Sequence, residues 1–336
     1  MTIGWDDVNA RVAGWRLHLL GRAALEQLAR EPDLAALARA LATLGYPLGP
    51  AARETAPGLL ERAARAVAGE RLTALARWCG PRTEVLALLF DDEDRRSIRA
   101  LVRGAAEGAA AGRRLAGCLP TPALPLRVLE TLADQSRIPA IGAALAAWRH
   151  PFAPAVLAAG AAAEPDLLAF ELELARRYAA RALGGARRDR RLLGAVRLAI
   201  DLDNLLAAVL LAGARSGLEP GAVFLEGGRS VTRPIFLEVA AAETRTEAAQ
   251  RLTRLLADRE LARLARGLAT ATGEFTRSAL ALRIRRARDE ARRDPLGPAP
   301  VVAYVLCVRQ ELLALQRMIW SHALRAGLTD PGELAA

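Results

Sequence analysis

Lysine is missing from this 336-residue sequence, and aromatic residues and cysteines are scarce. Because all 47 basic residues are therefore arginine, the lysine-dependent GxxxxGK[ST] phosphate loop is excluded. The three cysteines, Cys79, Cys118 and Cys307, form no CxxC pair, which argues against a disulfide framework or a zinc site. The GxSxG, HExxH and GxGxxG patterns of several enzyme classes are also missing. These absences indicate a protein that is not an enzyme and uses no cofactor.

Alanine and leucine supply most of the apolar residues, which make up 52% of the chain. Both residue types favour helix, and β-branched residues are sparse, so we predict an all-α protein. The net charge of +10 suits nucleic acid, anionic lipid or acidic protein surfaces. We find no apolar segment typical of a signal peptide and no uncharged apolar run of the roughly 18 residues that span a membrane. We therefore expect a soluble protein, or one that is peripheral to a membrane.

Proline- and glycine-rich breaks divide the chain into thirds, which we predict to be three similar helical domains over 1–117, 118–221 and 222–336. Each third contains a long predicted helix with an acid near its centre and a glycine at its end, a residue that suits a left-handed C-cap. The even spacing of these stretches indicates a repeated helical unit. The three stretches are residues 84–108, 192–217 and 301–327.

Polar residues interrupt the apolar helix predicted over 192–217. Arg197, Asp201 and Asn204 follow one another at i, i+4 and i+7 and therefore share one helix face. Asp203 points about 200° away from Asp201, so the two aspartates cannot chelate one cation from a regular helix. Further ligands at matching spacing are missing as well. We expect Arg197 to pair with Asp201, and Asn204 to bond to the backbone of a neighbouring segment.

The other two long helices carry acids at corresponding places. Asp94 and Ser97 occupy them in the first helix, and Glu311 does so in the last, where Ala314 replaces the second polar residue. A catalytic pair would not be expected to recur in three copies with such loose substitution. A polar side chain that only holds neighbouring segments against its helix, which we call a structural fastener, could recur in this way. We therefore predict no catalytic, cofactor-binding or metal-binding residue, and we interpret six residues as structural polar positions of a repeated helix: Asp94, Ser97, Arg197, Asp201, Asn204 and Glu311.

Three further stretches have competing interpretations. The acidic run FDDEDRR, residues 90–96, could be a cation site or a docking patch, but we favour a solvated helix N-terminal turn whose acids suit the helix dipole. The glycine pair within residues 223–230 suggests a phosphate loop, but a simple turn is favoured. Residues 251–269 place leucines at helical spacing between arginines, which predicts one amphipathic helix with a basic face.

Four stretches of the sequence, in the same order and at the same spacing, resemble one known family. Over nearly its whole length the chain is similar to the C subunit of rotary V/A-type ATPases, the counterpart of the d subunit of eukaryotic V-ATPases. The stretches are WDDVNARVAGWRLHLL (5–20), DRRSIRALVRGAAEG (94–108), DLDNLLAAVLLAGARSGLEPGAVFLEGGR (201–229) and DPLGPAPVVAYVLCVRQELLALQRMI (294–319). The chain departs from the family where Ser97 and Ala314 replace asparagine, and where Leu306, Val308 and Arg309 replace the usual lysine and glutamate.

The resemblance implies three all-α domains around a pseudo-threefold axis, shaped like a funnel. It also implies a rotor adaptor that receives the central shaft, which consists of the D and F subunits, and sits on the membrane proteolipid ring. Such an adaptor is cytoplasmic, peripheral on the membrane, and takes neither a small-molecule substrate nor nucleic acid. We expect part of the arginine excess to meet acidic or carbonyl-rich loops of the ring, or anionic lipid headgroups.

Two alternatives remain from the residues alone. The high net charge would also suit a basic all-α nucleic-acid-binding protein, whose affinity should fall steeply with salt. The few aromatic residues and the spread of arginine over every predicted helix count against it. The second alternative is a helical scaffold for some other partner.

Overall fold

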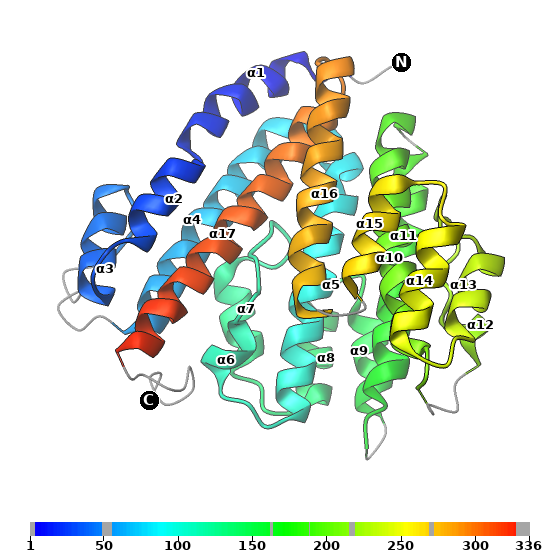
Figure 1. Cartoon of the computed structure of the whole chain (residues 1–336). Coiled ribbons are helices and arrows are strands. Elements are labelled where there is room, and N and C mark those ends of the chain that lie inside the picture. The colour runs from blue at the N-terminus through cyan, green and yellow to red at the C-terminus, as the bar shows by residue number, and fades with distance from the viewer. Residues whose placement is uncertain are drawn as a thin grey trace. The chain divides into compact units, whose positions relative to one another are not determined.

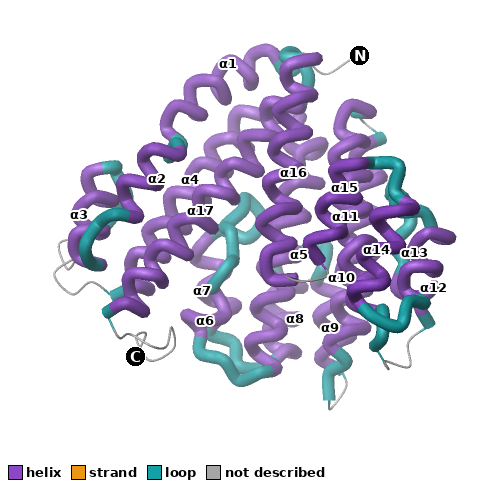
Figure 2. The backbone as a smooth tube through the Cα atoms, in the orientation of Figure 1, coloured by secondary structure: helices purple, strands orange, loops and turns teal. Residues whose placement is uncertain are grey.

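The computed structural model describes residues 4–48, 56–161, 164–187, 189–214, 219–268 and 272–326. Within these ranges all regular structure is helical, as Figure 2 shows, and no strand is present. The predicted all-α class is confirmed.

The chain divides by its internal contacts into two compact units. Unit 1 comprises Met1–Asn9 and Ala175–Leu306, and unit 2 comprises Ala10–Leu174 and Cys307–Ala336. Three helices are shared by the two units: α1 (Asp6–Trp15), α10 (Leu167–Ala186) and α17 (Ala299–Arg325). The predicted division into thirds differs from this partition and stays a prediction.

Unit 2 is built around the long helix α5 (Thr83–Ala106), which packs against α4, α6, α7 and α8 (Figure 1). The 3₁₀ turn η2 (Gly80–Arg82) connects α4 to α5. The remaining elements are η1 (Arg16–His18), α2 (Arg22–Ala29), α3 (Leu34–Thr43), α4 (Pro57–Cys79), α6 (Ala111–Leu115), α7 (Leu126–Ala133), α8 (Ile138–Ala147) and α9 (Ala153–Gly160).

Unit 1 is built in the same way around α11 (Leu193–Leu211), which packs against α13, α14, α15 and α16 (Figure 1). The turn η3 (Arg190–Leu192) directly precedes α11. The other elements are α12 (Pro220–Val223), α13 (Arg233–Ala240), α14 (Arg245–Leu255), α15 (Arg259–Leu268) and α16 (Thr272–Arg293).

The element order from α5 to α9 recurs from α11 to α15. In both series a 3₁₀ turn leads into a long helix, and one very short helix and three short helices follow. The N-cap residues of α7 and α13, Pro125 and Thr232, are separated by as many positions as Asp94 and Asp201. The described chain therefore contains a helical repeat, with both aspartates on the central helix of their copy.

Glycine ends the two central helices, although not always at the predicted position. Gly108, just after α5, has the left-handed backbone angle φ 67°, as predicted. α11 ends earlier than predicted, at Leu211, and its left-handed glycine is Gly213 with φ 69°. The predicted ends of the other two stretches, Gly217 and Gly327, lie outside the described residues.

The stretch predicted as one helix over 251–269 is two helices. α14 ends at Leu255 and α15 begins at Arg259, and the described part of the stretch stops at Leu268. The break arises at Asp258, whose Oδ1 accepts hydrogen bonds from the amides of Glu260 (3.0 Å) and Leu261 (3.2 Å). An aspartate that bonds to amides of the first turn is a strong helix N-cap.

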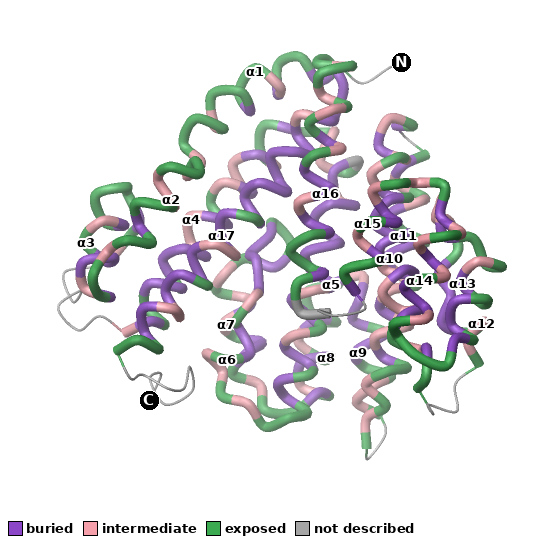
Figure 3. Tube along the Cα trace, in the orientation of Figure 1, coloured by how far each residue is buried: buried purple, intermediate pink, exposed green. Residues whose placement is uncertain are grey.

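Among the described helices, α17 alone is long and apolar enough to cross a membrane by length and composition. However, 78% of its most apolar window is buried inside the protein, and Figure 3 shows α17 as largely buried. Such burial is typical of a core helix.

Candidate functional site

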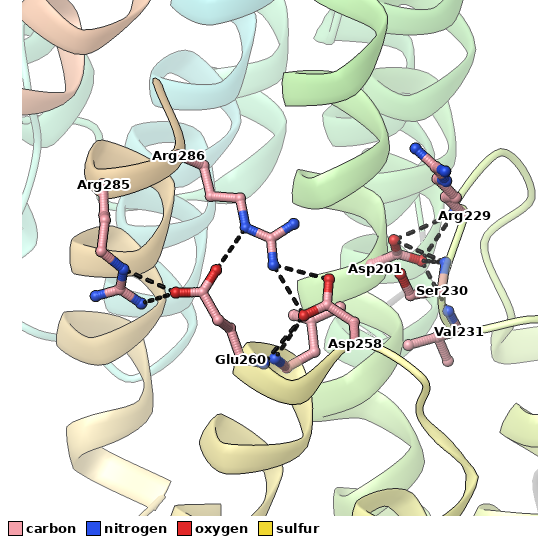
Figure 4. A network of polar contacts seen from close by, with 9 residues as sticks. Asp201, Arg229, Ser230, Val231, Asp258, Glu260, Arg285 and Arg286 are labelled. Carbon is pink, nitrogen blue, oxygen red and sulfur yellow. Dashed lines mark hydrogen bonds and ion pairs between the residues drawn. The ribbon is translucent and has the colours of Figure 1, made fainter. Parts of the chain in front are cut away.

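Asp201 lies on α11 and binds the backbone of the turn that precedes α13. Its Oδ1 accepts hydrogen bonds from the amides of Arg229 (2.9 Å), Ser230 (3.0 Å) and Val231 (2.9 Å). Its Oδ2 accepts from the first two of these amides, at 3.1 and 3.0 Å (Figure 4). The carboxylate is 2% exposed, so its charge is balanced by three oriented backbone dipoles. The aspartate thus fixes the turn to the central helix.

Asn204, one helical turn further along α11, holds the same connection at a second point. Its Nδ2 donates to the carbonyl oxygen of Leu225 (2.8 Å), and its Oδ1 accepts from the amide of Leu225 (2.9 Å). This pair satisfies both ends of the buried amide side chain. The interpretation that Asn204 bonds to the backbone of a neighbouring segment agrees with these contacts.

Arg197 does not form the ion pair that we predicted for it. It lies exposed on α11, and the described structure contains no ion pair between it and Asp201. The prediction of an Arg197–Asp201 pair was wrong because the backbone amides of residues 229–231 occupy both carboxylate oxygens. Arg197 is exposed whereas Asp201 and Asn204 are buried, and the sequence spacing did not reveal the turn that binds Asp201.

Asp94 occupies the corresponding position on α5 and binds side chains instead. Its Oδ1 accepts from the hydroxyl of Thr121 (2.5 Å), and its Oδ2 lies 3.3 Å from Nε2 of His150. The amide of Phe152 donates to Nδ1 of His150 (3.3 Å), so the ring proton belongs on Nε2 and is donated to Asp94. The hydroxyl of Thr121 also accepts from the amide of Leu124 (3.0 Å).

Ser97 repeats the position of Asn204 with a shorter side chain. Its hydroxyl accepts one hydrogen bond from the amide of Leu119, at 3.3 Å. Asp94 and Ser97 therefore hold the segment before α7 against the central helix of their unit, as Asp201 and Asn204 hold the segment before α13.

The acidic run over 90–96 is buried in the middle of α5. Asp91, Asp92, Glu93 and Asp94 are 6%, 1%, 3% and 1% exposed, so the predicted solvated N-terminal turn was wrong. The compensating charges explain the burial, since Asp92 Oδ1 accepts from Arg95 Nε (2.8 Å). Glu93 lies 3.3 Å from Arg309 of α17, a partner more than two hundred positions away in the sequence.

Glu311 lies on α17 within unit 2, and its partners among the described residues all come from the N-terminal part of the chain. Its carboxylate accepts from the amide of Leu20 (2.6 Å) and the hydroxyl of Tyr46 (2.8 Å), and it forms an ion pair with Arg71. Burial, together with the charge of Glu311, raises the pKa of Tyr46. The third acid therefore also fastens neighbouring segments, but these segments come from the first third of the sequence.

A fourth polar network, between α15 and α16, was not predicted from the sequence. Arg286 donates to both oxygens of Asp258, each at 2.8 Å, and its Nε donates to Glu260 (2.8 Å). Arg285 Nε donates to the other oxygen of Glu260 at 2.8 Å (Figure 4). The N-cap pattern at Asp258 could have revealed the start of α15, but nothing in the sequence pairs it with α16.

The arginines change the titration of both acids in this network. Burial alone would raise the pKa of Asp258, but hydrogen bonds from Arg286 and from the amides of Leu261 and Glu260 outweigh it and lower the pKa. Burial likewise opposes the shift at Glu260, where hydrogen bonds from Arg286 and Arg285 lower the pKa. Both carboxylates are therefore held as anions within an ionic cluster.

The arrangement of these groups is that of structural fasteners. The carboxylates of Asp94, Asp201 and Glu311 have their oxygens engaged by protein donors. Within the described ranges, no group of three or more histidine, cysteine, aspartate and glutamate residues could hold a metal ion.

Two comparisons with known proteins bear on identity. No curated protein matches the sequence. A family model described as the ATP synthase (C/AC39) subunit matches residues 8–323, which is nearly the whole chain. The chain belongs to this family, the C (or d) subunits of V/A-type rotary ATPases.

Proposed function

We propose that this protein is the rotor adaptor of a V/A-type rotary ATPase. It connects the D and F subunits of the central shaft to the membrane proteolipid ring, and it transmits torque for ATP-driven ion transport or for ATP synthesis. The protein cleaves no bond itself and lies on the cytoplasmic face of the membrane. The observation that carries the proposal is the family match over residues 8–323 of an all-helical chain.

The buried polar contacts support this role physically. A part that transmits torque must resist deformation, and each carboxylate fastener ties segments distant in sequence to one long helix. Asp201 binds a turn about 30 positions away, and Glu311 binds groups that lie near the other end of the chain. Oriented hydrogen bonds of this kind, set in a closely packed core, favour one rigid arrangement.

The three-domain funnel is also part of the proposal. The repeated order of α5–α9 and α11–α15 supplies two copies. A third copy would join α17 to the N-terminal helices, as the bonds of Glu311 suggest. An image of the assembled complex by electron cryomicroscopy should reveal three equivalent helical bodies, and two unequal bodies would contradict the funnel.

The adaptor role can be tested by assembly from purified parts. We expect the chain to bind the shaft subunits and the detergent-solubilised ring at the same time, so that a ternary complex elutes from size-exclusion chromatography. Failure to bind either component would contradict the role. Tight binding to duplex nucleic acid that falls steeply with salt, without binding to shaft or ring, would favour the alternative of a basic nucleic-acid-binding protein.

A further inference from the structure

A basic stripe runs along the outer face of α15. Arg259, Arg263 and Arg266 are spaced i, i+4 and i+7, so they share one face of the helix, and all three are exposed. None of the three forms a hydrogen bond or an ion pair through its side chain with the described residues. The stripe extends over about 10 Å at the rise of an α-helix.

The acids closest to the stripe in sequence cannot neutralise it. Asp258 and Glu260 face α16, where their oxygens are bound by Arg285 and Arg286. Figure 4 shows these acids pointing toward the arginines of α16. The stripe therefore keeps its charge and can attract a partner of opposite sign.

A groove lies beside the stripe, between α15 and α16. Its volume is about 380 Å³, and Leu264, Leu268, Phe275 and Leu282 belong to its apolar lining. Two acids line it as well: Glu260 is bound by the arginines of α16, and Glu274 forms an ion pair with Arg277. Arg263 lines this groove and also belongs to the stripe. Gly267 lies in the wall, where an added Cβ would meet no atom within 4 Å, so the missing side chain leaves the groove open.

We propose that the stripe and groove together bind an acidic amphipathic helix of a protein partner. Carboxylates spaced i, i+4 and i+7 on that helix would face the three arginines, and an apolar side chain would enter the groove. A membrane surface fits less well, because the described residues of α15 and α16 include no exposed large apolar side chain. Only the identity of the partner, as a component of the rotary complex, rests on the proposed function.

Two variants of the full chain test the two halves of the site separately. The first variant removes the charge of the stripe with three substitutions, Arg259→Gln, Arg263→Gln and Arg266→Gln. The second variant, Gly267→Leu, fills the groove and also improves helix propensity. The control for charge is Arg113→Gln, Arg127→Gln and Arg137→Gln, three exposed arginines of unit 2. The control for the glycine is Gly184→Leu on α10, where an added Cβ also meets no atom within 4 Å.

The probe is a synthetic helical peptide with glutamates at i, i+4 and i+7 beside a leucine-rich face, titrated by calorimetry. We expect the triple arginine variant and Gly267→Leu each to weaken binding at least about tenfold, while both controls stay within about twofold. Equal weakening by the charge control, or no effect of Gly267→Leu, would overturn the proposal. Anionic vesicles or duplex DNA that bind through the stripe more tightly than the peptide would overturn it too.

Purified shaft and ring components then separate this proposal from the adaptor role. If the wild-type chain binds neither, the adaptor role fails, while the peptide titration still decides the site. If it binds them but the triple arginine variant binds both equally well, the adaptor role stands and the proposed use of the stripe is contradicted.

Discussion

Asp94 and Asp201 hold corresponding positions on the central helices α5 and α11, but they bind different chemical groups. Asp201 accepts five hydrogen bonds from three consecutive backbone amides. Asp94 binds two side chains, the hydroxyl of Thr121 and the ring of His150. In each case the aspartate fixes the segment that precedes the first of three short helices. The position and the mechanical role are therefore repeated, although the partners are not.

The residues of the two connecting segments explain this difference. In unit 1 the connection contains Gly227 and Gly228, and an added Cβ on Gly228 would overlap Oδ1 of Asp201. Only glycine lets the backbone approach the carboxylate so closely that the following amides can bind it. In unit 2 the connection contains prolines, which lack an amide hydrogen, and the hydroxyl of Thr121 reaches Asp94 instead.

The largest expected effect is that of Asp201→Ala. It leaves three oriented amides without their acceptor, and we expect it to lower the free energy of unfolding by about 4 kcal/mol. Asp201→Asn keeps one acceptor oxygen and should lose about half as much. Urea denaturation followed by circular dichroism measures both, with the exposed Arg197→Gln as a control within about 0.5 kcal/mol. A loss under about 1 kcal/mol for Asp201→Ala would show that the turn keeps its conformation without the Asp201 carboxylate.

Asp94→Ala should cost less, about 2 kcal/mol, because its partners keep other bonds. Thr121 still accepts from the amide of Leu124, and His150 still accepts from that of Phe152. The same denaturation experiment compares this variant with Asp201→Ala. A greater loss at Asp94 than at Asp201 would contradict the order of strength assigned to the two sites.

Asn204→Ser tests the weaker pair of corresponding positions. A serine should retain one bond to Leu225, as Ser97 bonds once to Leu119, and lose the other. We expect a loss of about 1 kcal/mol, the net contribution of one hydrogen bond. A loss as large as that of Asp201→Ala would mean that Asn204, not Asp201, is the main fastener of this segment.

The smallest expected effect is the loss of stability when the pH is lowered. The pKa values of Asp258 and Glu260 are lower in the folded protein than in the unfolded chain. Their ionised forms therefore stabilise the fold, and this contribution is complete above about pH 4 to 5, where both acids are ionised in the unfolded chain as well. The contribution falls as the pH drops through their folded pKa values. Comparing thermal unfolding at pH 6 and pH 3, we expect Arg286→Gln to destabilise the protein at pH 6 and to matter less at pH 3. An equal effect at both pH values would contradict the ionic account.

The sequence predicts the all-α class and the aligned positions of Asp94, Ser97, Asp201 and Asn204, because helical spacing and composition are local properties. It does not predict the partners. The amides that bind Asp201 face it only once the turn before α13 is folded, and the burial of Glu93 depends on Arg309 of another helix. Contacts of this kind arise from tertiary packing, which helical spacing alone does not encode.

The adaptor role, the central claim, is tested most directly by coupling in reconstituted vesicles. A complex assembled without this chain should hydrolyse ATP but accumulate no ions in the vesicle lumen. Adding the purified chain should restore ATP-driven ion uptake, and Asp201→Ala should restore it only at temperatures at which the variant stays folded. Full ion uptake by the complex that lacks the chain would contradict the account.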